Sequence, residues 1–455
     1  MTARRVPVTG LPPRLPGLRL VLPLALIVPL GFAITNIART GQLDPGPMDL
    51  AVAFVALVAV ASAALAVSGY RGDPLIFPVA ATIGGLGLVM LNRLPQQPLG
   101  LNLFGVELGM AATQLVWFCL GVTVMLVIAL RLRDDGFLRH FKYTWALAGA
   151  LLLVITFLFG REVNGARLWL YLGPFGFQSG EAIKVSLVVF IAGYLAENRR
   201  VLAGASLRLG RLRLPPVPYL VPLVAVFVAV MLVVVISRDL GTALLFLGIF
   251  LTMLFVATGR RSYVLMGLLL FVAGSLVAYQ LFGHVRVRVD NWIDPFVDPT
   301  GAGYQTVQAL YAFGRGGLFG SGLGQGLPMV GGHLPIPALP TDFIFAGIAE
   351  ELGLIGAAGL LGLMLVLVVR GLRVAMLARD DFSAMLAVGL TLSLGLQTLI
   401  IAAGNLKLIP LTGITFPFVS YGGSSLLASF AVVGLLLSIS HRTALAVAAE
   451  GAPDQ

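Results

Sequence analysis

Long apolar runs separated by short polar segments recur along almost the whole chain. A helix needs about 20 apolar residues to cross a bilayer, and windows of that kind predict twelve membrane spans. The pattern therefore predicts an all-α polytopic membrane protein, because no polar block between residues 20 and 440 is long enough to fold separately. The predicted spans lie near residues 19–37, 48–69, 75–92, 108–130, 143–160, 181–198, 217–236, 240–258, 263–283, 342–369, 383–404 and 422–440.

Composition supports this fold class and excludes several functions. Of the 455 residues, 58% are hydrophobic and only 11% are charged, far from the balance of soluble domains. Cys119 is the only cysteine, which excludes an intrachain disulfide, and the four histidines show no metal-ligand spacing. The net charge of +10 is scattered between apolar spans, so we expect no nucleic-acid partner. The Arg-rich, then apolar N-terminus is typical of signal peptides, but we expect an uncleaved first span.

The distribution of basic residues predicts the orientation. With a cytoplasmic N-terminus, the inward segments carry 20 of the 30 lysines and arginines, as the positive-inside rule requires. Twelve spans then leave both termini in the cytoplasm. The polar segments that carry chemistry all fall on the outer face, whereas a transporter would place its polar residues near mid-membrane. These segments are residues 161–180, 237–239, 284–341 and 404–421.

Ionisable residues inside predicted spans need partners, since each costs a few kcal/mol at the bilayer centre. Glu181 and Lys184 stand at i, i+3 and can pair across one helical turn. Glu350 and Glu351 lie roughly 12 Å along the helix from Asp342, with no basic residue nearby in sequence. Their partners must come from other helices. Each pair has two interpretations, a structural ion pair or a functional group.

The outward segments carry motifs that occur in a fixed order. Read together, they resemble the SEDS family, the FtsW and RodA group of bacterial cell-wall polymerases, over roughly residues 143–441. The motifs are NGARLWLYLG with FQSGEAIK, then RDLGTALL, then DPTGAGYQTVQALYAFGRGGLFGSGLGQG with LPTDFIFAGIAEELGLIG, and finally PLTGITFPFVSYGGSSLL.

The chain departs from the family pattern at a few positions. Leu168 replaces the second Arg of NGARRW, Ser179 and Gly180 stand where QPSE has Pro and Ser, and the segment 337–340 lacks the usual acidic or His residues. Family members commonly have ten spans, so two N-terminal spans are additional. We expect an N-terminal region at 1–130, a SEDS-like catalytic core at 131–445 and a cytoplasmic tail at 446–455.

The resemblance implies an inverting peptidoglycan glycosyltransferase that polymerises lipid II on the outer face of the bacterial cytoplasmic membrane. It also implies a class B penicillin-binding protein as partner. Two rival functions stay open on the residues alone: a lipid II flippase, or a noncatalytic scaffold for that partner. Polymerisation needs a base for the acceptor hydroxyl and cations for the departing diphosphate.

The resemblance also implies the site residues. Asp298 occupies the family's essential aspartate position, in the context DP-x-G-x-GYQ, with Asp294 as the competing base. Arg286 or Arg288 would keep it ionised if the loop folds back. The motifs require no cofactor, but the outward carboxylates leave Mg²⁺ or Mn²⁺ open. The expected substrate-binding residues are Arg167, Glu181, Lys184, Tyr304, Gln305, Ser420 and Tyr421.

The glycine run 314–326 has spacing close to that of a nucleotide-binding loop, but no strand precedes it. We instead expect the glycines to allow close packing or an irregular re-entrant backbone. Asp239, between two spans, is expected to cap the helix that follows it.

Overall fold

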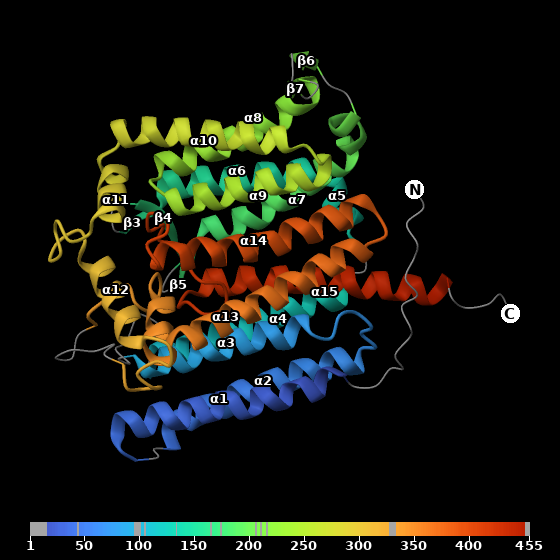
Figure 1. The fold of residues 1–455 in the computed structure, drawn as a ribbon. Coiled ribbons are helices and arrows are strands. Elements are labelled where there is room, and N and C mark those ends of the chain that lie inside the picture. The colour runs from blue at the N-terminus through green and yellow to red at the C-terminus, as the bar shows by residue number, and fades with distance from the viewer. Residues whose placement is uncertain are drawn as a thin grey trace.

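The long helices of the computed structural model run side by side in one bundle (Figure 1). The structure describes the whole chain apart from a set of short segments. The segments outside the description are 1–15, 43–44, 95–101, 104–105, 133, 164–165, 173–174, 205–206, 210–211, 215–216, 327–333 and 451–455.

Fifteen helices account for most of the described chain. The first eight are α1 (Pro16–Thr40), α2 (Pro45–Val67), α3 (Ile76–Arg93), α4 (Met110–Arg131), α5 (Gly136–His140), α6 (Lys142–Phe159), α7 (Ser179–Gly204) and α8 (Val217–Ile236). The others are α9 (Leu240–Thr258), α10 (Arg261–Leu281), α11 (Gly283–Ile293), α12 (Tyr304–Gly316), α13 (Ile344–Leu377), α14 (Asp381–Asn405) and α15 (Gly423–Glu450).

The membrane spans follow the apolar windows of the sequence. In the described part of the chain, 11 helices are long and apolar enough to cross a bilayer, and α8 adds a shorter apolar stretch, Val221–Ile236. The predicted polytopic all-α fold is therefore confirmed, and each of the twelve predicted windows has its helix. The two N-terminal helices α1 and α2 lie at one edge of the bundle, beside α3, and α10 lies at the opposite edge (Figure 1).

Short antiparallel strands are the one class of element that the sequence did not predict. The pairs β1 (Asn102–Leu103) with β2 (Val106–Glu107), and β6 (Leu207–Leu209) with β7 (Leu212–Leu214), form two small ribbons. The larger sheet has the order β3 (Arg161–Val163), β4 (Ala166–Leu172) and β5 (Phe175–Gln178). It joins α6 to α7, so its last strand leads directly into the helix that carries Glu181.

The polar segments predicted to lie outside gather at one end of the bundle. The sheet β3–β5, α11 and α12 lie together there (Figure 1). The other end carries ion pairs between helix ends and connecting turns. These pairs are Asp73 with Arg370, Asp135 with Arg442, Lys142 with Glu197, and Arg199 with Asp381.

The glycine run forms an irregular backbone that packs against a break in α13. At Gly353 the helix departs from helical geometry, with φ 68° and ψ −170°. The N–H groups of Ser321 and Gly322 donate to the carbonyl oxygens of Glu350 and Glu351, each at 3.0 Å. A Cβ on Gly320 would lie 2.2 Å from the Glu351 carbonyl oxygen. Only glycine permits this approach, so the expectation of close, irregular packing is confirmed.

Candidate active site

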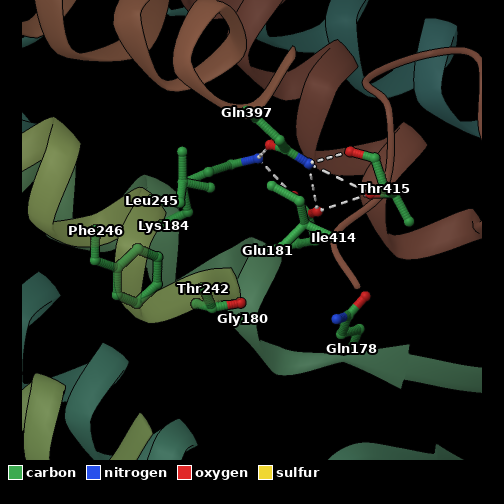
Figure 2. A pocket seen from close by; sticks show the side chains of 10 residues that line it. All are labelled: Gln178, Gly180, Glu181, Lys184, Thr242, Leu245, Phe246, Gln397, Ile414 and Thr415. Carbon is green, nitrogen blue, oxygen red and sulfur yellow. Dashed lines mark hydrogen bonds and ion pairs between the residues drawn. The ribbon is translucent and has the colours of Figure 1, made fainter. Parts of the chain in front are cut away.

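Glu181 and Lys184 form a buried ion pair at the start of α7. Lys184 Nζ lies 2.6 Å from Glu181 Oε2, and the Lys184 side chain is only 1% exposed. The i, i+3 spacing places both side chains on one face of the helix, so the predicted pairing is confirmed. Both residues line a small pocket (Figure 2).

Gln397 of α14 completes a closed ring with this pair. Its Oε1 accepts a hydrogen bond from Lys184 Nζ at 2.7 Å, and its Nε2 donates to Glu181 Oε1 at 3.2 Å (Figure 2). The same Nε2 donates to the carbonyl oxygen of Thr415 at 3.0 Å. Gln397 was not predicted from the sequence, because it is uncharged, lies in a mostly apolar helix and is more than 200 positions from Glu181 and Lys184.

The rest of the pocket is half polar and half apolar. Gln178 and Thr415 continue the polar side, and the Thr415 hydroxyl donates to Ser425 Oγ at 2.7 Å. Leu245, Phe246 and Ile414 form the apolar side. Such a lining suits a ligand with a charged group next to a hydrocarbon chain. The charged group can contact the polar side chains and the hydrocarbon can contact the apolar ones.

Asp298 lies in the exposed turn that precedes α12. Its Oδ1 accepts a hydrogen bond from the Gly301 N–H at 3.0 Å, and its Oδ2 accepts one from the Ala302 N–H at 2.8 Å. These bonds orient the carboxylate within the turn between α11 and α12. Asp294, the competing base, accepts instead from the Phe296 N–H at 2.9 Å.

The two arginines expected beside Asp298 make their contacts elsewhere. Arg286 stacks over the Tyr279 ring and donates to the Gln280 carbonyl oxygen. Arg288 donates to the carbonyl oxygens of Leu411 and Thr412, at 3.4 and 3.1 Å. The expected support of the Asp298 charge is therefore wrong for this conformation. From α11, the Arg288 side chain reaches the loop before α15 rather than the turn at Asp298.

Arg288 instead interacts electrostatically with two buried carboxyl groups, those of Asp239 and Asp342. Burial raises the pKa of Asp239, and hydrogen bonds from Thr242 together with the Arg288 charge offset this only in part. Burial likewise raises the pKa of Asp342, against the opposing charge of Arg288. Asp239 accepts the Thr242 N–H at 3.0 Å, so the predicted cap of α9 is confirmed.

The remaining expected substrate residues are distributed over the same end of the bundle. Arg167, on β4, is half exposed and lies 3.6 Å from Glu162 across the sheet. The neighbouring Asn164 and Gly165 fall outside the described residues. Tyr304 begins α12 as expected, and Gln305 Oε1 accepts the N–H of Ala338 at 3.2 Å.

Ser420 and Tyr421 serve the packing of the turn before α15. The Ser420 hydroxyl donates to the Thr341 carbonyl oxygen and accepts the Phe416 N–H. The Tyr421 N–H donates to the Pro340 carbonyl oxygen at 2.8 Å. Ser420 is 3% exposed, so the structure brings it near the pocket wall without opening it to a ligand.

The two deep glutamates find partners on other helices, as expected. Arg315 of α12 lies 2.9 Å from Glu350, and Arg93 of α3 lies 3.3 Å from Glu351. Glu351 also accepts the Gly324 N–H at 2.8 Å. No three His, Cys, Asp or Glu side chains of the described chain come together as metal ligands.

Comparison with known proteins gives a consistent match. The family FtsW/RodA/SpoVE, described as "Cell cycle protein", matches residues 73–445. The peptidoglycan glycosyltransferase RodA of Mycobacterium tuberculosis is 40% identical over 455 positions, covering 97% of this chain and 94% of that protein. Stage V sporulation protein E of Bacillus subtilis is 37% identical over 310 positions, covering 66% of this chain and 80% of that protein.

Solved structures match the same core. A peptidoglycan synthase complex, described as coordinating polymerization and crosslinking, contains a chain with TM-score 0.65 and 28% identity. Rod shape determining protein RodA of Thermus thermophilus has TM-score 0.57 and 26% identity. Both cover 82% of this chain. The family match begins after α1 and α2, but the mycobacterial match includes them, because only 3% of this chain lies outside that alignment.

Proposed function

The chain belongs to the FtsW/RodA/SpoVE family, and we propose that it is a peptidoglycan glycosyltransferase that polymerises lipid II into glycan strands for cell elongation or division. The observation that carries this proposal is the buried Glu181–Lys184 pair, open to a half-apolar pocket. Asp298 lies in the turn between α11 and α12, and these two helices stand at the end of the bundle that also holds the sheet before α7 (Figure 1).

The proposed chemistry divides between a base and a cationic pocket. Asp298 takes the proton from the acceptor hydroxyl as this oxygen attacks the anomeric carbon of the donor sugar. The bond between that carbon and the diphosphate oxygen breaks with inversion, and the polyprenyl diphosphate leaves. Lys184 and Arg167 hold the diphosphate, because cations stabilise the charge that develops on it. Tyr304 and Gln305 flank the path of the sugar or peptide.

The setting of the reaction is the outer face of the bacterial cytoplasmic membrane. The chain is a multi-pass membrane protein with 11 candidate spans in its described part. In the proposed orientation both termini face the cytoplasm, since the inward segments carry most of the basic residues. A class B penicillin-binding protein is the proposed partner, supported by the likeness to a synthase complex. Residues 131–445 would then form the catalytic core.

The test uses purified full-length protein in lipid vesicles with fluorescent lipid II. We expect glycan polymer on a gel, from the chain alone or after addition of a class B penicillin-binding protein. Transbilayer movement of lipid II without polymer would indicate the flippase, and neither activity with the partner present would indicate the scaffold. A parallel reaction with EDTA, then with Mg²⁺ or Mn²⁺ restored, decides whether a divalent cation assists the diphosphate.

A further inference from the structure

The ring around Gln397 leaves one donor of Lys184 for the pocket. An ammonium carries three protons, and within the described chain Lys184 Nζ has two acceptors, Glu181 Oε2 at 2.6 Å and Gln397 Oε1 at 2.7 Å. Lys184 itself lines the pocket. A water or a ligand in the pocket can accept the third proton, and an anionic oxygen is the group that best satisfies a cation.

The amide of Gln397 can bridge the pair only in one orientation. Its oxygen faces the ammonium, so its two N–H donors face Glu181 Oε1 and the Thr415 carbonyl oxygen. The side chain is 1% exposed, so water cannot replace these bonds at low cost. Figure 2 shows the amide lying between the Lys184 nitrogen and the Thr415 side chain. Gln397 thereby contacts both members of the ion pair and the segment that closes the pocket.

We propose that Gln397 is a positioning residue: it orients the ammonium of Lys184 so that it donates both to Glu181 and to a diphosphate oxygen of the substrate. This inference rests on the proposed function. Without the amide oxygen, Lys184 has only Glu181 as its partner, and the two charges satisfy each other. With it, the ammonium is held between two acceptors and its third proton is directed to the pocket. Gln397 takes no part in bond making.

Two substitutions separate positioning from simple packing. Q397L keeps the approximate volume and removes every hydrogen bond of the amide. We expect polymerisation to fall about 10- to 100-fold, the effect of losing hydrogen bonds to charged groups, with binding of polyprenyl diphosphate weakened by a similar factor. The matched control is T398V, on the same helix, because Thr398 is buried and, among the described residues, its hydroxyl bonds to the Leu394 carbonyl oxygen of its own helix alone. T398V should keep wild-type activity.

Q397E provides a readout that a packing role would not change. The introduced carboxyl can donate to Glu181 only when it is protonated. Its activity relative to wild type should therefore be highest at low pH and fall as pH rises, because the ionised form repels Glu181 and captures Lys184. The other charged groups near this site are Asp239, which interacts electrostatically with Glu181, and Arg288, which interacts with Asp239. Both are present in wild type, so the activity ratio isolates the introduced group.

The decisive experiment measures polymerisation of lipid II and binding of undecaprenyl diphosphate by each purified variant between pH 5 and 8, with melting temperature as a fold check. Equal loss in Q397L and T398V, or a Q397E to wild-type ratio that does not change with pH, would overturn the inference. Wild type that binds undecaprenyl diphosphate without making polymer would refute the proposed function alone. Wild type that does neither would overturn both.

Discussion

Nη1 of Arg288 donates a hydrogen bond to the carbonyl oxygen of Thr412 at 3.1 Å, which fastens α11 to the segment that ends at the pocket. Three residues further on, Thr415 accepts from Gln397. One turn further along α11, Asn291 donates to the Ala302 carbonyl oxygen at 2.8 Å, next to the turn that Asp298 caps. A continuous chain of contacts thus joins the ion pair to the turn at Asp298.

Arg288→Met should weaken both the fold of this end and the polymerisation reaction. The variant keeps the apolar stem but loses the donors to Leu411 and Thr412 and the cation near Asp239. We expect a loss of about 1–3 kcal/mol in the free energy of unfolding, measured by thermal melting in detergent, and a clear fall in polymer yield. Arg286→Met is the control, since its cation–π contact with Tyr279 is exposed to solvent and should contribute little. Equal effects of the two substitutions would contradict the role of Arg288.

Asp239 should make the protein less stable as pH rises. Burial raises its pKa in the folded state above the ordinary value of 3.8. A group with a raised folded pKa contributes its stability below the unfolded pKa and loses it as pH rises through the folded value. Melting temperatures measured from pH 4 to 8 should therefore decline over that window, with Asp342 adding to the slope.

The variants of Asp239 test this assignment. Asn also caps helices, so Asp239→Asn should reduce the pH dependence and match or exceed wild-type stability near pH 8. Asp239→Ala removes the bond to the Thr242 N–H and should cost about 0.5–2 kcal/mol at low pH, and less as pH rises, because the variant also lacks the buried ionisable group. An Asn variant as pH-dependent as wild type would show that the slope arises elsewhere.

Elements set by local pattern were predictable from the sequence, and those set by distant contacts were not. The spans follow from apolar windows, and the Glu181–Lys184 pair follows from i, i+3 spacing. The sheet β3–β5 was missed because its strands are short and lie in a segment read as a polar loop. Gln397 carries no charge that would demand a partner. Arg288 was misassigned because sequence proximity to Asp298 does not determine which way a helix faces.

The Glu181–Lys184 pair should behave as one unit in mutagenesis. Lys184→Met leaves a buried carboxylate without its cation, which costs about 3–5 kcal/mol. Glu181→Gln leaves the cation similarly unpaired. The double variant removes both charges, so its melting temperature should lie above the value expected from adding the single effects. Polymerisation should stay absent in all three. Recovery of polymer in the double variant would show that the pair serves only the fold.

Asp298→Asn should abolish polymerisation with little change in folding. Asn keeps the size and one acceptor oxygen for the turn, but it cannot take the acceptor hydroxyl proton, and a positioned base contributes about 10²–10⁴-fold. Asp294→Asn is a matched control, because Asp294 is also exposed and also accepts a main-chain N–H. We expect that variant, and Asp290→Asn, to be milder. Near wild-type polymerisation by Asp298→Asn would make Asp294 or a metal-bound water the leading base.

Deletion of the two additional helices should leave part of the chemistry intact. A chain that starts near residue 68 lacks α1 and α2 but keeps the three spans that precede the sheet. It loses the packing of α1 against the glycine run, where a Cβ on Gly324 would lie 2.5 Å from Ala38. Because Gly324 also donates to Glu351, we expect reduced but measurable polymerisation and a lower melting temperature. Gly324→Ala in the full chain is the companion variant, since it disturbs the same contact at φ +78°. A well-folded truncated protein with no activity would show that α1 and α2 belong to the substrate path.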